Sequence, residues 1–161
     1  MTSMLLHKVQ HFLEKASRGE GEGLPPHLIN EFKEMCGSAI ERQFSEKRGS
    51  KVRMSGVGKP LCQQKLSARD DIEEDVDYTM VMKFLFGDII EAIAVTVMKA
   101  AGVNIQSEQE GVSLDIGGTT LRGTYDVKID DKIYDIKSAA PGAFSMKFAA
   151  NRGYNNIKKD D

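Results

Sequence analysis

Cysteine is scarce in this sequence of 161 residues, which contains only Cys36 and Cys62. Two cysteines argue against a disulfide framework and fit a reducing compartment. They also cannot supply the four thiolates of a zinc or iron–sulfur site within the chain. We therefore expect a cytoplasmic protein with a packed hydrophobic core.

A long apolar run and a large excess of one charge are also missing. The most apolar stretch, near residue 90, is interrupted by Asp88 and Glu91, so we expect no membrane partner. The net charge of −2 implies no global attraction to nucleic acid, and any such binding must come from local patches. With 40% hydrophobic and 29% charged residues, the chain is typical of one soluble globular domain.

The most informative stretch runs from Gly123 to Lys137 and predicts a β-hairpin, because apolar and charged residues alternate along it. A two-residue turn at Asp130 and Asp131 would place Asp126 directly across from Asp135. Opposed residues have Cβ atoms about 5 Å apart, and two like charges placed so are destabilising. The pair therefore needs compensation.

A divalent cation would supply that compensation, because Mg²⁺ and Mn²⁺ bind carboxylate oxygens. Lys137 projects from the same face as Asp135, and its ammonium could hold an attacking water or a phosphate there. The alternative is a solvated hairpin face on which lysines balance the acids.

Residues 78–101 give the longest helical signal, which Gly102 should end. This segment is apolar nearly all round, so we expect a buried helix. Glu91 lies near its middle, where an unpaired carboxylate is costly. A metal shared with Asp126 and Asp135 is one candidate partner; solvent or a lysine is the alternative.

A basic, glycine-rich segment at residues 47–60 is the best candidate for contacting phosphate. It has no acidic residue, and its glycines let the backbone approach a ligand closely. The alternative is a solvated basic loop. Its cations are Lys47, Arg48, Lys51, Arg53 and Lys59.

The remaining patterns predict the order of the elements. Helical spacing appears at residues 4–15 and 28–40, and strand-like alternation at 103–115 leads to a turn at Gly117 and Gly118. A further helix is expected at 144–150. This order predicts an α+β or α/β fold with one mixed sheet.

Three motifs in this order resemble the PD-(D/E)XK nuclease superfamily, in particular RecB-type and phage-type exonucleases. They are Gly87-Asp-Ile-Ile-Glu91, Gly123-Thr-Tyr-Asp126 and Asp135-Ile-Lys137. The resemblance covers about residues 51 to 148. It implies a restriction-endonuclease-like core at 51–161, with a central mixed β-sheet flanked by helices, after an N-terminal helical extension at 1–50.

The resemblance also implies roles for single residues. Mg²⁺ or Mn²⁺ would be held by Glu91, Asp126, Asp135 and the main-chain carbonyl of Ile136. Lys137 would position or activate the water that attacks phosphorus, while the metal stabilises the added negative charge.

The segment before the core resembles the DNA-contacting segment of phage and CRISPR-associated members. Arg53 and Ser55 are thereby candidates for binding a terminal phosphate, and Lys59 for contacting DNA. Some relatives use a cysteine here to ligate an iron–sulfur cluster. The other cysteines of such a cluster are absent, so Cys62 is expected to be a packing residue.

The chain departs from the RecB type in lacking a Gln-x-x-x-Tyr motif after Lys137. This departure predicts either a C-terminally truncated core or a short member of the superfamily. The leading hypothesis is a metal-dependent deoxyribonuclease, an exonuclease acting on DNA in phage-type degradation, recombination or repair, in the host cytoplasm if viral. The alternative is a non-catalytic DNA-binding or assembly protein with the nuclease fold. No pattern specifies an oligomeric state.

Overall fold

The computed structural model describes residues 2–45, 54–67, 69 and 77–138. Two segments that carried predictions lie outside the described residues: the basic stretch at 47–53, with Arg53, and the helix expected at 144–150. The domain division at residue 50 falls in an undescribed segment as well.

Helices form where the apolar spacing predicts them. The two N-terminal helices, α1 (Thr2–Ser17) and α2 (Pro26–Ser45), correspond to the first two helical patterns. The long helix α4 (Tyr78–Ala100) ends just before Gly102, whose φ of 72° is the left-handed conformation that favours glycine at a helix end. Between α2 and α4 lie two short elements, η1 (Met54–Gly56) and α3 (Leu61–Ser67).

The sheet has the order β1-β2-β3, with β1 (Ile105–Ile116), β2 (Thr119–Ile129) and β3 (Lys132–Tyr134). Both expected two-residue turns are present. The chain is therefore α+β. The mixed sheet was a wrong prediction for the described residues, because both strand pairs are antiparallel. Strands joined by two-residue turns can pair only in this way.

The core lies where the helices meet the end of the sheet formed by the start of β1 and the end of β2. Its buried members come from the last turns of α4 and from β2, together with Val103 between α4 and β1. Side chains of α1 and α2 also pack against it, and so do both arms of the β2–β3 hairpin. The central cluster is Val95, Val103, Val127 and Ile129, surrounded by Leu5, Val9, Met35, Met98, Ile105, Tyr134 and Ile136.

Helix α4 is less buried than its apolar sequence predicts. Four of its residues are buried: Leu85, Ala92, Val95 and Thr96. Other large apolar side chains of the same helix are exposed, among them Met82, Phe86, Ile90 and Ile93. Helices α2 and α1 contact α4, and its core side packs toward the sheet, whereas no other element of the described residues covers the side that carries these exposed side chains.

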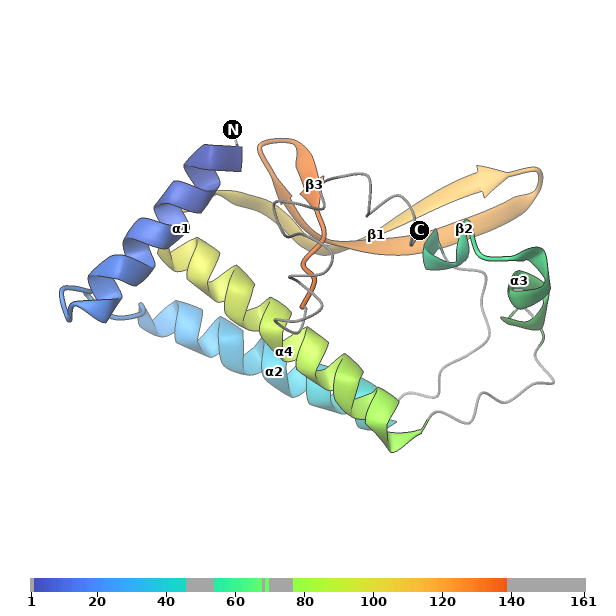
Figure 1. Cartoon of the computed structure of the whole chain (residues 1–161), viewed down its shortest axis with the longest axis horizontal. Coiled ribbons are helices and arrows are strands. Elements are labelled where there is room, and N and C mark those ends of the chain that lie inside the picture. The colour runs from blue at the N-terminus through green and yellow to red at the C-terminus, as the bar shows by residue number, and fades with distance from the viewer. Residues whose placement is uncertain (1, 46–53, 68, 70–76, 139–161) are drawn as a thin grey trace, which may run out of the picture.

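Figure 1 shows α2 and α4 side by side beneath the sheet, with α1 beside the end of α4. The far arm of the β1–β2 ribbon extends beyond α2 and α4 (Figure 1), and η1 contacts β2. None of the helices in the described part of the chain has the length and apolar character needed to cross a membrane.

Candidate metal and phosphate site

The β2–β3 hairpin brings the two predicted strand acids together. Its turn residues, Asp130 and Asp131, have φ of 49° and 60°, as a tight hairpin turn requires. Val127 pairs with Tyr134, so the same register places Asp126 across from Asp135, where the ladder ends. The predicted opposition of the two carboxylates therefore follows from the observed turn.

The backbone after β3 closes on Asp126. The main-chain N–H of Ile136 donates a hydrogen bond to Asp126 Oδ2. One residue further, the Lys137 ammonium donates to Asp135 Oδ1 over 2.9 Å. Asp126, Asp135, Lys137 and the Ile136 main chain thus lie together at the end of the hairpin.

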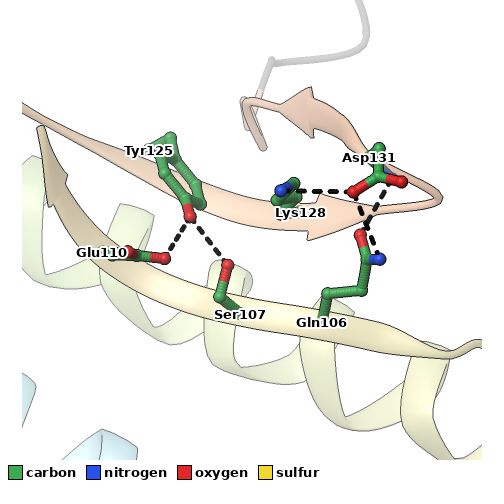
Figure 2. Close-up of polar contacts among 6 residues, drawn as sticks. All are labelled: Gln106, Ser107, Glu110, Tyr125, Lys128 and Asp131. Atoms are coloured by element: carbon green, nitrogen blue, oxygen red, sulfur yellow. Dashed lines mark hydrogen bonds and ion pairs between the residues drawn. The ribbon is translucent and has the colours of Figure 1, made fainter.

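A contact from β1 holds the hairpin turn in place. The Asp131 main-chain N–H donates to Gln106 Oε1 over 2.8 Å, and Lys128 Nζ lies 3.3 Å from Asp131 Oδ1 (Figure 2). The pairing of β1 and β2 shifts between Ile105 and Ser107, so Gln106 lies at the resulting irregularity. The irregularity therefore gives Gln106 access to the turn, and the contact supports the hairpin register.

A second polar group fixes the same ribbon further along. The Tyr125 hydroxyl donates to Glu110 Oε2, and Ser107 Oγ lies 2.7 Å from the same hydroxyl (Figure 2). The bond from Tyr125 holds the pKa of Glu110 below its usual value. Tyr125 directly precedes Asp126, so this group also limits how Asp126 can move.

Helix α4 contributes Glu91, which is half-buried. Its carboxylate accepts a hydrogen bond from the side-chain amide of Gln109. Gln109 has a left-handed φ of 48° and lies in β1 between the residues paired with Tyr125 and Val127, level with Asp126. The predicted need of Glu91 for a partner is thus met by an amide rather than by a lysine.

Burial raises the pKa of Glu91, and the bond from Gln109 partly opposes this rise. The negative charges of Asp126 and Asp88 raise the pKa further. The main cause is burial, which disfavours the ionised form, and the nearby acids add to it.

All three predicted acids affect the pKa of Lys137. Its hydrogen bond to Asp135 is the largest cause of its raised pKa, and the charges of Asp126 and Glu91 raise the pKa further. The end of the hairpin thus holds Asp126, Asp135 and Lys137 close together, and Glu91 of α4 is near enough for its charge to affect Lys137.

Carboxylates and a main-chain carbonyl are hard oxygen donors of the kind that Mg²⁺ and Mn²⁺ bind. Among the described residues, no three acidic, histidine or cysteine side chains are close enough to hold one ion in this arrangement. Each acid has a local donor: Gln109 for Glu91, the Ile136 N–H for Asp126 and Lys137 for Asp135. A carboxylate can accept several bonds, so these donors leave oxygen lone pairs free on each acid, and the residue types suit a divalent ion.

The described part of the predicted phosphate-contacting segment begins at Met54, which lies against β2 at Gly123. A Cβ atom on Gly123 would lie 2.9 Å from Met54 Sδ and 3.1 Å from Met54 Cβ. The glycine of the Gly-x-x-Asp motif therefore allows η1 to cross β2 three residues before Asp126.

The three predicted DNA-binding residues have different outcomes. Arg53 directly precedes η1 but is not described. The backbone of Ser55 lies in η1, and its side chain is not described. Lys59 follows η1 and is exposed, with its main-chain carbonyl accepting a bond from Gln64. The structure leaves the contact of these residues with DNA as a prediction.

Sequence reasoning missed two groups next to Glu91. Asp88 lies one helical turn before Glu91 and is held by Arg42 Nη2 at 3.0 Å and Gln43 Nε2 at 2.8 Å. Its spacing from Glu91 could have signalled it. Gln109 carried no local signal, because its place beside Glu91 depends on the pairing of β1 with β2.

A scan against protein-family models, a search of curated proteins and a search of solved structures each gave no match to this chain. The residues and their geometry are therefore the basis on which a function can be inferred.

Proposed function

We propose that this protein is a metal-dependent deoxyribonuclease with a restriction-endonuclease-like core, an exonuclease serving phage-type DNA degradation, recombination or repair. The observation that supports the proposal is the end of the hairpin, where Lys137 bonds to Asp135, the Ile136 N–H bonds to Asp126, and the charge of Glu91 on α4 raises the pKa of Lys137.

The surplus of negative charge supports the proposal. Burial raises the pKa of Glu91, and the negative charges of Asp126 and Asp88 raise it further. Like charges placed together are destabilising, so proteins keep them chiefly where they bind a cation or perform chemistry.

In this function Glu91, Asp126, Asp135 and the Ile136 carbonyl would hold Mg²⁺ or Mn²⁺. A bound divalent ion stabilises the negative charge that phosphate oxygens gain in the transition state. Lys137 is exposed and carries three N–H donors, so it can orient a water or hold a scissile phosphate oxygen. Lys59 would contact the DNA backbone, together with Arg53 and Ser55.

The direct test is cleavage of end-labelled linear DNA and closed circular DNA with Mg²⁺ or Mn²⁺. The wild-type chain should degrade the linear DNA alone, and Asp135→Asn should lose this activity. Asp115→Asn is the matched control, since it neutralises an exposed acid on the far arm of the ribbon. Cutting of the circle as well would indicate an endonuclease.

Equal cleavage by Asp135→Asn and Asp115→Asn would overturn the assignment of the site. Binding of DNA by the wild type without cleavage under any metal would support the alternative, a non-catalytic DNA-binding or assembly protein.

A further inference from the structure

Gln109 has a backbone conformation that glutamine seldom adopts. Its φ of 48° is left-handed, although it lies within β1 rather than in a turn. Among the described residues, the other non-glycine residues with positive φ are Asp130 and Asp131, which form the hairpin turn. A left-handed conformation costs energy for any residue with a Cβ atom, and such strain persists only where the surroundings hold it. Contacts around Gln109 must therefore stabilise this conformation.

The side chain of Gln109 contacts the long helix. Its amide donates a hydrogen bond to Oε1 of Glu91. β1 and β2 keep the same register on both sides of Gln109, so the deviation is confined to one residue, level with Asp126. The charge of Asp126 also acts on Glu91, because it contributes to the raised pKa of that carboxyl. The one strained residue of β1 therefore lies between the helix acid and a strand acid.

The bond holds Glu91 without neutralising it. A glutamine amide has no net charge, so the carboxylate keeps its negative charge while one oxygen is fixed, and Oε2 can still bind a cation. Asp88, one turn earlier in the same helix, is instead held by a cation, with Arg42 Nη2 at 3.0 Å. A cation placed beside Glu91 would compete with a metal ion for the carboxylate, whereas an amide does not.

We propose that Gln109 is a positioning residue, which orients the Glu91 carboxylate toward a divalent cation shared with Asp126. This inference rests on the proposed function, because it takes both acids as ligands of Mg²⁺ or Mn²⁺. A side chain that orients a metal ligand through a hydrogen bond typically contributes about 10- to 100-fold to metal affinity. The left-handed backbone of β1 is then the local cost of placing the amide beside Glu91.

The test is the affinity of the full chain for Mn²⁺, measured by calorimetric titration in two variants. Gln109→Met removes the amide but keeps a side chain of similar length. Gln109→Gly removes the side chain and suits the left-handed backbone. Each should bind Mn²⁺ about 10-fold or more weakly than the wild type. Ser113→Gly is the matched control, because it places glycine at another exposed position of β1, where φ is not positive, and should keep the wild-type affinity.

Urea unfolding separates a positioning role from a structural one. Gln109→Gly should unfold at the same urea concentration as the wild type or a higher one, because glycine relieves the strain while one hydrogen bond is lost. Ser113→Gly should unfold at a lower concentration, since glycine weakens an ordinary strand position. A structural residue would lose stability and Mn²⁺ affinity together. Destabilisation of Gln109→Gly to the extent of Ser113→Gly would therefore overturn the proposal.

A double-mutant cycle tests whether Gln109 acts through Glu91. In a Glu91→Gln background, Gln109→Met should cause no further loss of Mn²⁺ affinity, because the carboxylate that it orients is already absent. Equal losses with and without the Glu91 carboxylate would mean that Gln109 does not act through it.

The outcomes distinguish this inference from the proposed nuclease function. A wild type that binds Mn²⁺ and cleaves DNA, with unchanged affinity in Gln109→Met, would overturn the role of Gln109 alone. Weaker Mn²⁺ binding by Gln109→Met in a chain that never cleaves DNA would support that role and remove the nuclease. A wild type that binds no Mn²⁺ would overturn both. Circular dichroism checks folding, and Gln109→Gly decides the outcome if Gln109→Met unfolds.

Discussion

Two charged clusters include residues of α4 about two helical turns apart, and they differ in the balance of positive and negative charge. At Lys99 the ammonium lies 2.7 Å from Glu31 Oε2 and 2.6 Å from Glu108 Oε1, joining α2, α4 and β1. At Glu91 three acids share one lysine, and the pKa of Glu91 is raised. The first cluster satisfies its charges and connects elements, whereas the second accumulates negative charge.

The pKa directions express this difference. Burial alone would lower the pKa of Lys99, yet its bonds to Glu108 and Glu31 outweigh burial and raise the pKa. The charged form of Lys99 is therefore favoured in the folded protein. The charged form of Glu91 is disfavoured there relative to the protonated form. We infer that the Lys99 cluster serves stability and the Glu91 cluster serves function.

The largest expected effect is on cleavage. Lys137→Ala should lower DNA cleavage by at least about 100-fold, because the group that positions water or phosphate is lost. The free energy of unfolding should change by less than about 0.5 kcal/mol, since the side chain is 78% exposed. Cleavage assays and urea denaturation followed by circular dichroism measure the two quantities.

Lys132→Ala is the matched control in the same hairpin, since Lys132 is exposed and next to the turn. Calorimetric titration should show Mn²⁺ binding to Lys137→Ala at near wild-type affinity. Undiminished cleavage by Lys137→Ala would remove the basis for a functional role of the cluster.

The second effect is on stability. Lys99→Met should lower the free energy of unfolding by about 1–2 kcal/mol, because Glu31 and Glu108 lose their cation while Lys99 is only partly exposed. Cleavage by the folded fraction should be retained. Lys83→Met on the exposed side of α4 is the control. A Lys99→Met protein as stable as Lys83→Met would mean that the two clusters do not differ as described.

The third effect concerns the contact between η1 and β2. Gly123→Ala should cost about 1 kcal/mol, because its Cβ would crowd Met54. Met54→Ala in the same chain should recover part of this loss, and a double-mutant cycle measures the recovery. Additive effects of the two changes would contradict the close contact. A fall in cleavage by Gly123→Ala beyond its stability loss would connect η1 to the site.

The smallest effect has the opposite sign. Glu91→Gln should raise the free energy of unfolding at pH 7 by a few tenths of a kcal/mol, because solvent screens much of the penalty on this half-exposed carboxylate. Its folded pKa is raised above the unfolded value of 4.5, so wild-type stability falls as pH rises through the folded pKa.

The gain in the free energy of unfolding of Glu91→Gln should therefore vanish below about pH 4, where the wild-type carboxyl is protonated in both the folded and the unfolded state. Denaturation curves at pH 4 and pH 7 test this dependence. The same variant should lose cleavage. A loss of stability at pH 7 would mean that Glu91 is a structural group like the acids around Lys99.

Local patterns were enough to predict the hairpin. Alternation along residues 123–137 and two adjacent aspartates predict the turn, and the observed φ values of Asp130 and Asp131 agree. The end of α4 before Gly102 was predictable for the same reason. A register follows from a turn by counting, so the opposition of Asp126 and Asp135 needed no knowledge of distant residues.

Burial of α4 was not predictable in this way. An apolar sequence all round the helix predicts cover on every side, but Phe86 and Ile90 are exposed because no described element packs there. Gln109 is a similar case, since its bond to Glu91 requires a helix and a strand 18 residues apart to meet. The spacing of residues along the chain contains no information on such contacts between distant elements.

The sequence by itself determined the helices α1, α2 and α4, the three strands, their two turns and the residue types of the candidate site, because each depends on neighbours in the chain. Only the tertiary structure decided that Glu91 reaches the hairpin, that Lys99 unites three elements and that α4 keeps one apolar side uncovered. These outcomes depend on how distant elements pack, where burial and charge are balanced across the whole molecule.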